Sequence, residues 1–138
     1  MARKRVFISF DWDNDRQYKF LLNAWAVSNR VDLSFNDQTP REIKSDNLSR
    51  IKAAITAKIK KSTYTLLIVG KEANKRHKDA NKIGFKNWIN FEINKSKGNT
   101  KIRVLKLRKS YVLPEELRGT IYRYRTGYSA ENIADLLK

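Results

Sequence analysis

The chain has 138 residues, and its 41% hydrophobic content, with three Trp, six Tyr and six Phe, suffices for one core, so we expect a single domain over residues 1–138. Thirty Lys and Arg against fourteen Asp and Glu give a net charge of +16, which fits either a solvated basic surface or a site for phosphates, nucleic acid or another acidic surface. The absence of cysteine excludes disulfides, thiolate metal sites and a cysteine nucleophile.

The first predicted element is a buried strand over residues 6–10, Val-Phe-Ile-Ser-Phe, which stops at the polar run from Asp11 to Asp15. Because this apolar stretch ends at Asp11, it is too short for a signal peptide or a membrane span, and no later segment reaches that length. We therefore expect a cytoplasmic protein without a membrane partner. A helix is expected next, capped by the Asp and Asn residues, because apolar residues recur on one helix face at Tyr18, Leu21, Leu22 and Trp25.

The middle of the chain continues this alternation of strands and helices. Residues 31–35 alternate between apolar and polar side chains, which predicts a half-exposed strand near a sheet edge, and residues 36–40 have the composition of a turn. A helix is expected over residues 46–61, where isoleucines recur on one side. Residues 64–69 form the most strand-like segment of the chain, and Gly70 closes it.

The last part of the chain has weaker signals. A polar stretch over residues 71–82 leads to a helix from about 85 to 95, and a fourth strand is expected over residues 102–107. Residues 120–124 predict a fifth, weaker strand, and Ser129 caps a final helix.

Strands that alternate with helices predict parallel pairing with right-handed crossovers. We therefore expect an α/β protein with a flavodoxin-like three-layer fold, in which helices cover both faces of a central five-stranded parallel sheet. Ligands in such folds bind beyond the carboxyl ends of the strands, beside the first strand. This places residues 9–15, residues 36–40 and the chain from Gly70 onward around one cleft.

Glu92 is the first candidate for chemistry. It follows Trp88 by four residues, so both side chains share a face of the predicted helix. If Phe85, Ile89 and Ile93 form the row that contacts the core, Glu92 lies about 100° around the helix from Ile93, where a carboxylate can face a cleft. Spacing alone favours an ordinary surface glutamate, with Trp88 covering the edge of the core.

The acidic residues Asp11, Asp13 and Asp15 suggest a divalent metal site of the receiver-domain or nuclease kind, although helix capping explains them more simply. A receiver domain needs an aspartate at the end of the third strand, where this chain has residues 69–71, Val-Gly-Lys. A nuclease would combine Asp11 or Asp13 with Glu92 and bind DNA through the basic surface.

Other catalytic signatures are missing from the sequence. The five glycines are not grouped, so there is no glycine-rich phosphate loop. His77 is the only histidine, which excludes a histidine metal cluster within the chain and favours a solvated loop residue, with a ligand phosphate as the alternative contact. Ser9 ends a strand without the turn glycines of a hydrolase elbow, so a serine triad is not expected.

Three segments resemble motifs of Toll/interleukin-1 receptor (TIR) domains. Residues 5–10, Arg-Val-Phe-Ile-Ser-Phe, resemble the first strand of that family. Residues 66–69, followed by a polar loop and then by residues 88–93, Trp-Ile-Asn-Phe-Glu-Ile, resemble its third strand and the Trp-x-x-x-Glu of its next helix. The order agrees from about residue 4 to residue 107. More narrowly, the chain resembles the stand-alone bacterial and archaeal TIR-like group that includes the Thoeris antiphage protein ThsB.

This resemblance implies an enzyme that cleaves the nicotinamide glycosidic bond of NAD and makes ADP-ribose or a cyclic or conjugated relative. It gives Glu92 the catalytic role, with NAD as substrate and no metal or cofactor. Asp37 would begin the loop after the second strand. The nicotinamide ring would be held by Phe10, Trp12 or Trp88, and lysines and arginines would meet the pyrophosphate. The first loop of the nucleotide site would be formed by Ser9, Phe10, Asp11 and Trp12.

The resemblance also implies partners. The nucleotide product would act on a separate effector protein in antiphage defence, and copies of the chain would self-associate through TIR–TIR contacts. Two other readings stay open: a non-enzymatic TIR-like assembly module, and a basic nucleic-acid-binding protein or nuclease.

Overall fold

The computed structural model describes residues 4–35 and 47–138, so the expected turn over residues 36–40, with Asp37, lies outside the described residues. Five strands form one sheet in the order β2-β1-β3-β4-β5, and every pairing is parallel. This confirms the predicted flavodoxin-like sheet and the edge position of its second strand. The strands are β1 (Lys4–Ser9), β2 (Leu33–Phe35), β3 (Tyr64–Val69), β4 (Lys101–Lys106) and β5 (Arg123–Thr126).

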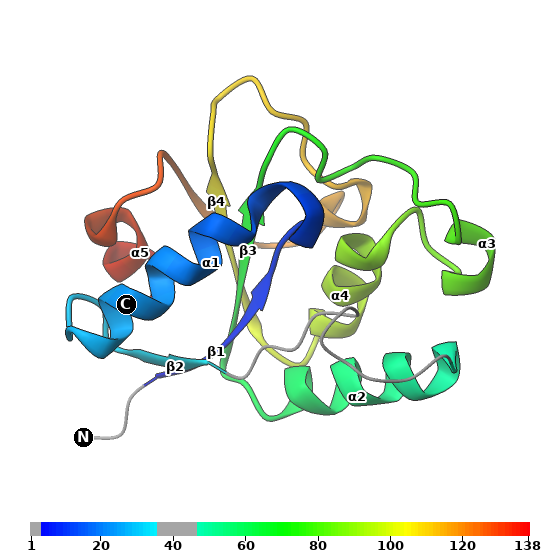
Figure 1. Cartoon of the computed structure of the whole chain (residues 1–138), viewed down its shortest axis with the longest axis horizontal. Helices are drawn as coiled ribbons and strands as arrows, with labels where there is room; N and C mark the ends of the chain where they lie inside the picture. Colours follow the sequence, from blue (N-terminus) through cyan, green and yellow to red (C-terminus); the bar gives the residue numbers. More distant parts are fainter. Residues whose placement is uncertain (1–3, 36–46) are drawn as a thin grey trace.

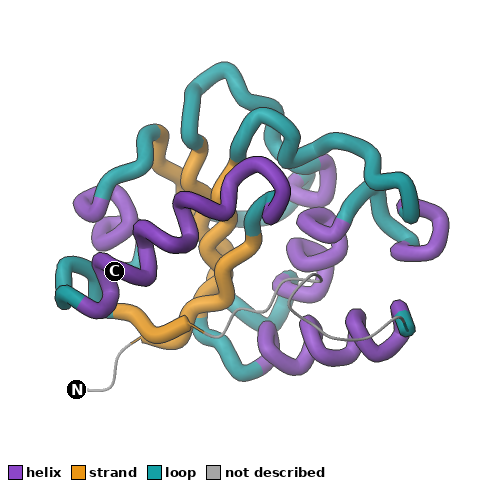
Figure 2. Tube along the Cα trace, in the orientation of Figure 1, coloured by secondary structure: helices purple, strands orange, loops and turns teal. Residues whose placement is uncertain are grey.

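Helices cover both faces of this sheet (Figure 1). One face carries α1 (Trp12–Val27) and α5 (Ala130–Leu136), and the other carries α2 (Leu48–Lys60) and α4 (Trp88–Ser96). The strands lie between these two helical layers in Figure 2. Two short helices, α3 (Ala80–Ile83) and the 3₁₀ turn η1 (Glu115–Leu117), complete the described elements.

The core follows the alternation of side chains along β1. Val6 and Ile8 pack with residues of α1 and α5, whereas Phe7 packs with α2 and with Phe91 of α4. Because successive side chains of a strand point to opposite faces, Ser9 falls on the face of Phe7, toward α4. The alternation thus sets the direction of the last side chain of β1.

The third long helix begins later than the sequence pattern predicts. Its first residue is Trp88, because the side chain of Asn87 accepts a hydrogen bond from the Asn90 backbone N–H and caps the helix there. Phe85 precedes the helix and packs edge-on to Phe91, with ring centroids 5.8 Å apart. The expected row of Phe85, Ile89 and Ile93 is therefore wrong, since only the two isoleucines share a core cluster.

The last strand is also displaced from its predicted position. It covers residues 123–126 instead of 120–124, and Ile121 is 96% exposed before it. The strand is fixed by pairing with β4 and by ion pairs from Arg123 and Arg125 to Asp135 of α5. Neither contact has a signature in local sequence.

A chain of hydroxyl groups, from the buried residues Thr65 and Ser96 and the half-buried Thr100, fixes α4 to the sheet. The Ser96 hydroxyl donates to the Glu92 backbone carbonyl at 2.8 Å, so the Thr65 hydroxyl donates to Ser96 in their 2.7 Å contact. Thr100 then donates to Thr65, also at 2.7 Å. Each of the three hydroxyl groups therefore donates one hydrogen bond, from Thr100 to Thr65, from Thr65 to Ser96 and from Ser96 to the Glu92 carbonyl.

Replacing Thr65 by valine is expected to lower the free energy of unfolding by about 1–2 kcal/mol, because the Ser96 and Thr100 hydroxyls each lose a buried partner while the side-chain volume stays nearly constant. The matched control is Thr63→Val at the neighbouring exposed threonine, with a change of at most about 0.5 kcal/mol. Urea unfolding of both variants measures the difference, and equal midpoints would contradict the role of the hydroxyl chain.

Within residues 4–35 and 47–138, no helix combines the length and the apolar composition needed to span a membrane.

Candidate active site

Two of the predicted site residues meet at the carboxyl end of β1. The Ser9 hydroxyl donates a hydrogen bond to Glu92 Oε1 at 2.6 Å, and the two residues are 0% and 3% exposed. This length is typical of a hydroxyl that donates to a carboxylate. Glu92 is therefore not the surface residue that helical spacing alone favours.

The position of Glu92 is fixed from several directions. The first turn of α4 is anchored by Asn87, whose amide donates to the Ala73 and Lys75 carbonyls in the loop after β3. Asn90, which is fully buried, accepts a hydrogen bond from the Glu116 backbone N–H of η1. These asparagines were not among the predicted site residues, because no periodic pattern marks a side chain that binds loop backbone. The resulting scaffold holds the Glu92 carboxylate on a rigid element.

Trp88 does not accompany Glu92 into this contact. Its ring packs against the core cluster of α2 and meets Phe91 edge-on, with centroids 5.6 Å apart. The residue therefore covers the edge of the core, and its contact with a ligand stays a prediction.

The remaining predicted residues lie on the α1 side of β1. Phe10 is buried in the core under α1, and Asp11 caps that helix by accepting from the Asp13 backbone N–H, which confirms the capping interpretation. Trp12 packs near Phe10, and the cationic groups of Arg16 and Lys19 each lie 5.8 Å from its ring centroid. Arg16 and Lys19 therefore lie beside the Trp12 ring, where the cationic nicotinamide ring was expected to bind. The predicted nucleotide residues thus fall into two groups on opposite faces of the sheet.

Asp15 is a buried carboxylate that sequence analysis assigned only to capping or metal binding. It is 6% exposed, its Oδ2 atom has no hydrogen-bond partner among the described residues, and it lies against Gly70 at the end of β3. Burial, together with the negative charge of Asp11, raises the pKa of Asp15 from 3.8 to about 6. The contact joins the first turn of α1 to the end of β3.

The raised pKa of Asp15 predicts a pH-dependent stability. Between pH 4 and 6 the folded protein retains a proton on Asp15 that the unfolded chain has released. The contribution of protonated Asp15 to the free energy of unfolding is therefore fully present below pH 4 and is lost as pH rises through about 6. Asp15→Asn should remove that loss because asparagine does not titrate. The free energy of unfolding of the variant, relative to wild type, should therefore rise by roughly 2–3 kcal/mol from pH 4 to pH 7. Urea unfolding across this range measures it; a constant difference would contradict the assignment.

The described residues contain no cluster of side chains that could form the alternative metal site. No three His, Asp or Glu side chains there come close enough to hold an ion, and Asp13 is exposed. His77 is half-buried, and its Nδ1 accepts the Asp79 backbone N–H within a turn.

Charges of both signs surround the carboxyl edge of the sheet. Asp11 and Asp13 begin α1, next to β1. The loops after β3 and β4, which rise beside each other in Figure 1, carry the exposed residues Lys71, Arg108 and Lys109. The edge therefore carries Asp11 and Asp13 together with Arg16 and Lys19 near α1, and it is basic near the ends of β3 and β4.

Comparisons with known proteins agree with this architecture. The Clostridium botulinum CMP N-glycosidase BcmB has a TM-score of 0.58 and 12% identity over 97% of this chain and 98% of that one. A prokaryotic SEFIR domain has a TM-score of 0.51 and 17% identity over 97% and 87% of the two chains. Both are similar in fold.

No curated protein matches the sequence. The family described as Thoeris protein ThsB, TIR-like domain, matches residues 7–112, which is most of the chain. The protein therefore belongs to the ThsB TIR-like family.

Proposed function

We propose that this protein is an N-glycosidase that cleaves the nicotinamide glycosidic bond of NAD, with Glu92 as its catalytic carboxylate. The observation that carries the proposal is the hydrogen bond from Ser9 to Glu92 at the carboxyl end of β1. Membership in the ThsB TIR-like family supports it, and a CMP N-glycosidase of similar fold acts on the same kind of bond in another nucleotide.

The chemistry needs a carboxylate beside the ribose. When the C1′–N bond breaks, nicotinamide leaves as a neutral molecule with the bonding electrons, and positive charge develops on the ribose. Glu92 stabilises that charge and accepts hydrogen bonds from the ribose hydroxyls, while Ser9 holds the carboxylate in one orientation. Water then adds hydroxide to C1′ and releases a proton, which gives ADP-ribose. A ribose or nucleotide hydroxyl in place of water gives a cyclic or conjugated product.

The charges at the carboxyl edge suit the two ends of NAD. Asp11 and Asp13 attract the cationic nicotinamide ring, and Lys71, Arg108 and Lys109 attract the pyrophosphate. Because Ser9 and Glu92 are buried, NAD reaches them only when side chains at this edge move apart. A buried carboxylate then acts in a site from which water is largely excluded, where its electrostatic effect is strong. The product would serve as a signal to a separate effector protein in antiphage defence.

A substrate survey tests this proposal. Concentrated wild-type protein is incubated with NAD or with CMP, and the products are separated by chromatography and identified by mass. We expect nicotinamide release from NAD, and the mass of the second product distinguishes hydrolysis, cyclisation and conjugation. Release of cytosine from CMP, without release of nicotinamide from NAD, would keep the assignment as an N-glycosidase but make CMP its substrate instead of NAD. Release of neither base, even with crowding agents, would reject the enzyme.

One observation favours a second candidate, a non-enzymatic assembly module. α1 exposes the large apolar residues Phe20, Leu21 and Val27. Exposed apolar patches on a folded domain often mark a surface that binds a partner. Sedimentation at increasing concentration tests this candidate. A module without enzymatic function would associate through α1 and leave both nucleotides intact.

A further inference from the structure

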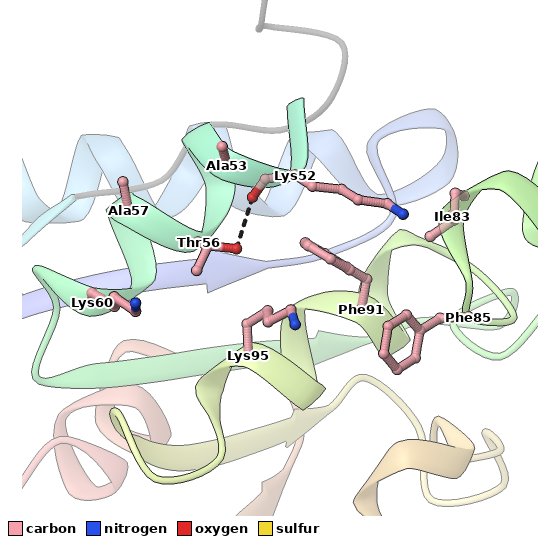
Figure 3. Close-up of a pocket in the computed structure, with 9 residues that line it drawn as sticks. All are labelled: Lys52, Ala53, Thr56, Ala57, Lys60, Ile83, Phe85, Phe91 and Lys95. Atoms are coloured by element: carbon pink, nitrogen blue, oxygen red, sulfur yellow. Dashed lines mark hydrogen bonds between the residues drawn. The ribbon is translucent and has the colours of Figure 1, made fainter. Parts of the chain in front are cut away.

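A groove of about 490 Å³ lies between α2 and α4. Its floor is apolar and is formed by Ile83, Phe85 and Phe91, with Ala53 and Ala57 of α2 along one wall (Figure 3). The groove is separate from the Ser9–Glu92 contact, because Phe91 packs with the α2 cluster whereas Glu92 is bonded to β1.

Three lysines surround this apolar floor. Lys52 and Lys60 come from α2 and Lys95 from α4 (Figure 3). The Lys52 ammonium group donates to the Lys82 carbonyl at 3.0 Å, and that of Lys95 lies 5.5 Å from the centre of the Phe91 ring. No acidic residue lines the groove, and none of the three lysines forms an ion pair within the described parts of the chain. Among the described side chains, therefore, none neutralises their positive charge.

The spacing of the lysines indicates the size of the ligand. Lys52 and Lys60 are eight residues apart on α2, which corresponds to about 12 Å along the helix axis. An extended peptide covers that distance with about four residues. Every second side chain of such a peptide points the same way, so carboxylates near its two ends can reach the lysines while an apolar side chain between them enters the groove.

We propose that this groove binds a short acidic segment of a partner protein, with one aliphatic or aromatic side chain seated on Phe85 beside Ala53 and Ala57. The net charge of +16 favours an acidic partner and opposes a second copy of this chain. The apolar lining favours a peptide over a nucleic acid, whose phosphates would meet the lysines but leave Phe85, Ala53 and Ala57 uncovered.

A peptide library displayed on phage tests the proposal without knowledge of the partner. Phage are selected on the wild-type protein and depleted on the Ala57→Trp variant, in which the groove is filled. We expect the enriched sequences to carry Asp or Glu on both sides of Leu, Ile or Phe. Enrichment of basic or uncharged sequences, or no enrichment over depletion, would overturn the proposal.

Binding of one enriched peptide, measured by fluorescence polarisation, locates the site. Lys60→Glu should weaken it about fivefold, whereas Lys61→Glu, an equal charge change on the neighbouring exposed lysine outside the groove, should change it less than twofold. Ala57→Trp should abolish it by filling the groove without changing charge. Circular dichroism confirms that each variant is folded.

Two results would replace the proposal by another partner. If Lys60→Glu and Lys61→Glu weaken the peptide equally and Ala57→Trp has no effect, the lysines act as part of a general basic surface, and a dT20 oligonucleotide would show the same pattern. If Lys60→Glu disrupts self-association in sedimentation, the groove binds a second copy. Neither readout depends on NAD cleavage.

Discussion

Glu92→Gln is expected to reduce the rate of nicotinamide release at least 1,000-fold, because the amide keeps the shape of the side chain but removes the negative charge that stabilises the developing ribose cation. The Ser9 hydroxyl can donate to the glutamine oxygen as it does to Glu92, so the fold should be retained. Initial rates at saturating NAD measure the effect.

The control for this variant is Glu131→Gln on α5, where the glutamate forms an exposed ion pair with Arg30. Its rate should stay within twofold of wild type, since it removes one carboxylate from the surface far along the chain from α4. A Glu92→Gln variant that is folded by circular dichroism and cleaves NAD at the wild-type rate would remove Glu92 from the mechanism.

Gly70→Ala is expected to lower the free energy of unfolding by about 2–3 kcal/mol. The added Cβ atom would lie 2.0 Å from Asp15 Oδ2 and 2.6 Å from Asp15 Oδ1, so the buried carboxyl group must move. Glycine is needed here for space and not for its backbone angle, because Gly70 is not among the residues with positive φ. Urea unfolding measures the loss.

A double variant identifies the cause of that loss. Asp15→Ala removes the carboxyl group that the Gly70→Ala side chain would contact. The free energy of unfolding of the double variant should therefore be at least 1 kcal/mol higher than the sum of the two separate effects predicts. Gly84→Ala serves as control. No atom of the described residues lies within 4 Å of its added Cβ, so only the strain at its φ of 85° remains. Additive effects of Asp15→Ala and Gly70→Ala would contradict the contact.

The sequence predicted most of the fold because core strands have a strong local signal. β3 is buried at all six positions, and its apolar run is bounded by polar residues and by Gly70. Helices such as α2 bury one face, so isoleucines recur at the helical period. These patterns identify the elements and their order, from which parallel pairing follows.

Tertiary contacts explain what the patterns did not predict. All four residues of β5 are exposed, so no apolar period marks it, and its position depends on Asp135 and on β4. Similarly, the start of α4 depends on the Asn87 cap, which separates Phe85 from the helix. A helical period continued through Phe85 could not reveal that break.

The candidate site was predicted from motif resemblance and not from spacing. Ser9 and Glu92 are 83 positions apart, and only the folded sheet brings them into contact. Spacing placed Trp88 and Glu92 on one face, but their side chains pack against different neighbours. Asp15 and Gly70 had separate local interpretations, a helix cap and a strand end, and their contact depends on the approach of α1 to β3.

The crystal structure of Glu92→Gln with bound NAD tests the central claim most directly, because this variant is expected to bind the substrate without consuming it. The nicotinamide ribose should lie at the carboxyl end of β1, with its hydroxyls within hydrogen-bond distance of residue 92 and of Ser9. NAD bound elsewhere, for example in the groove between α2 and α4, with the side chains of Ser9 and residue 92 still buried, would contradict the assignment of this contact as the active site.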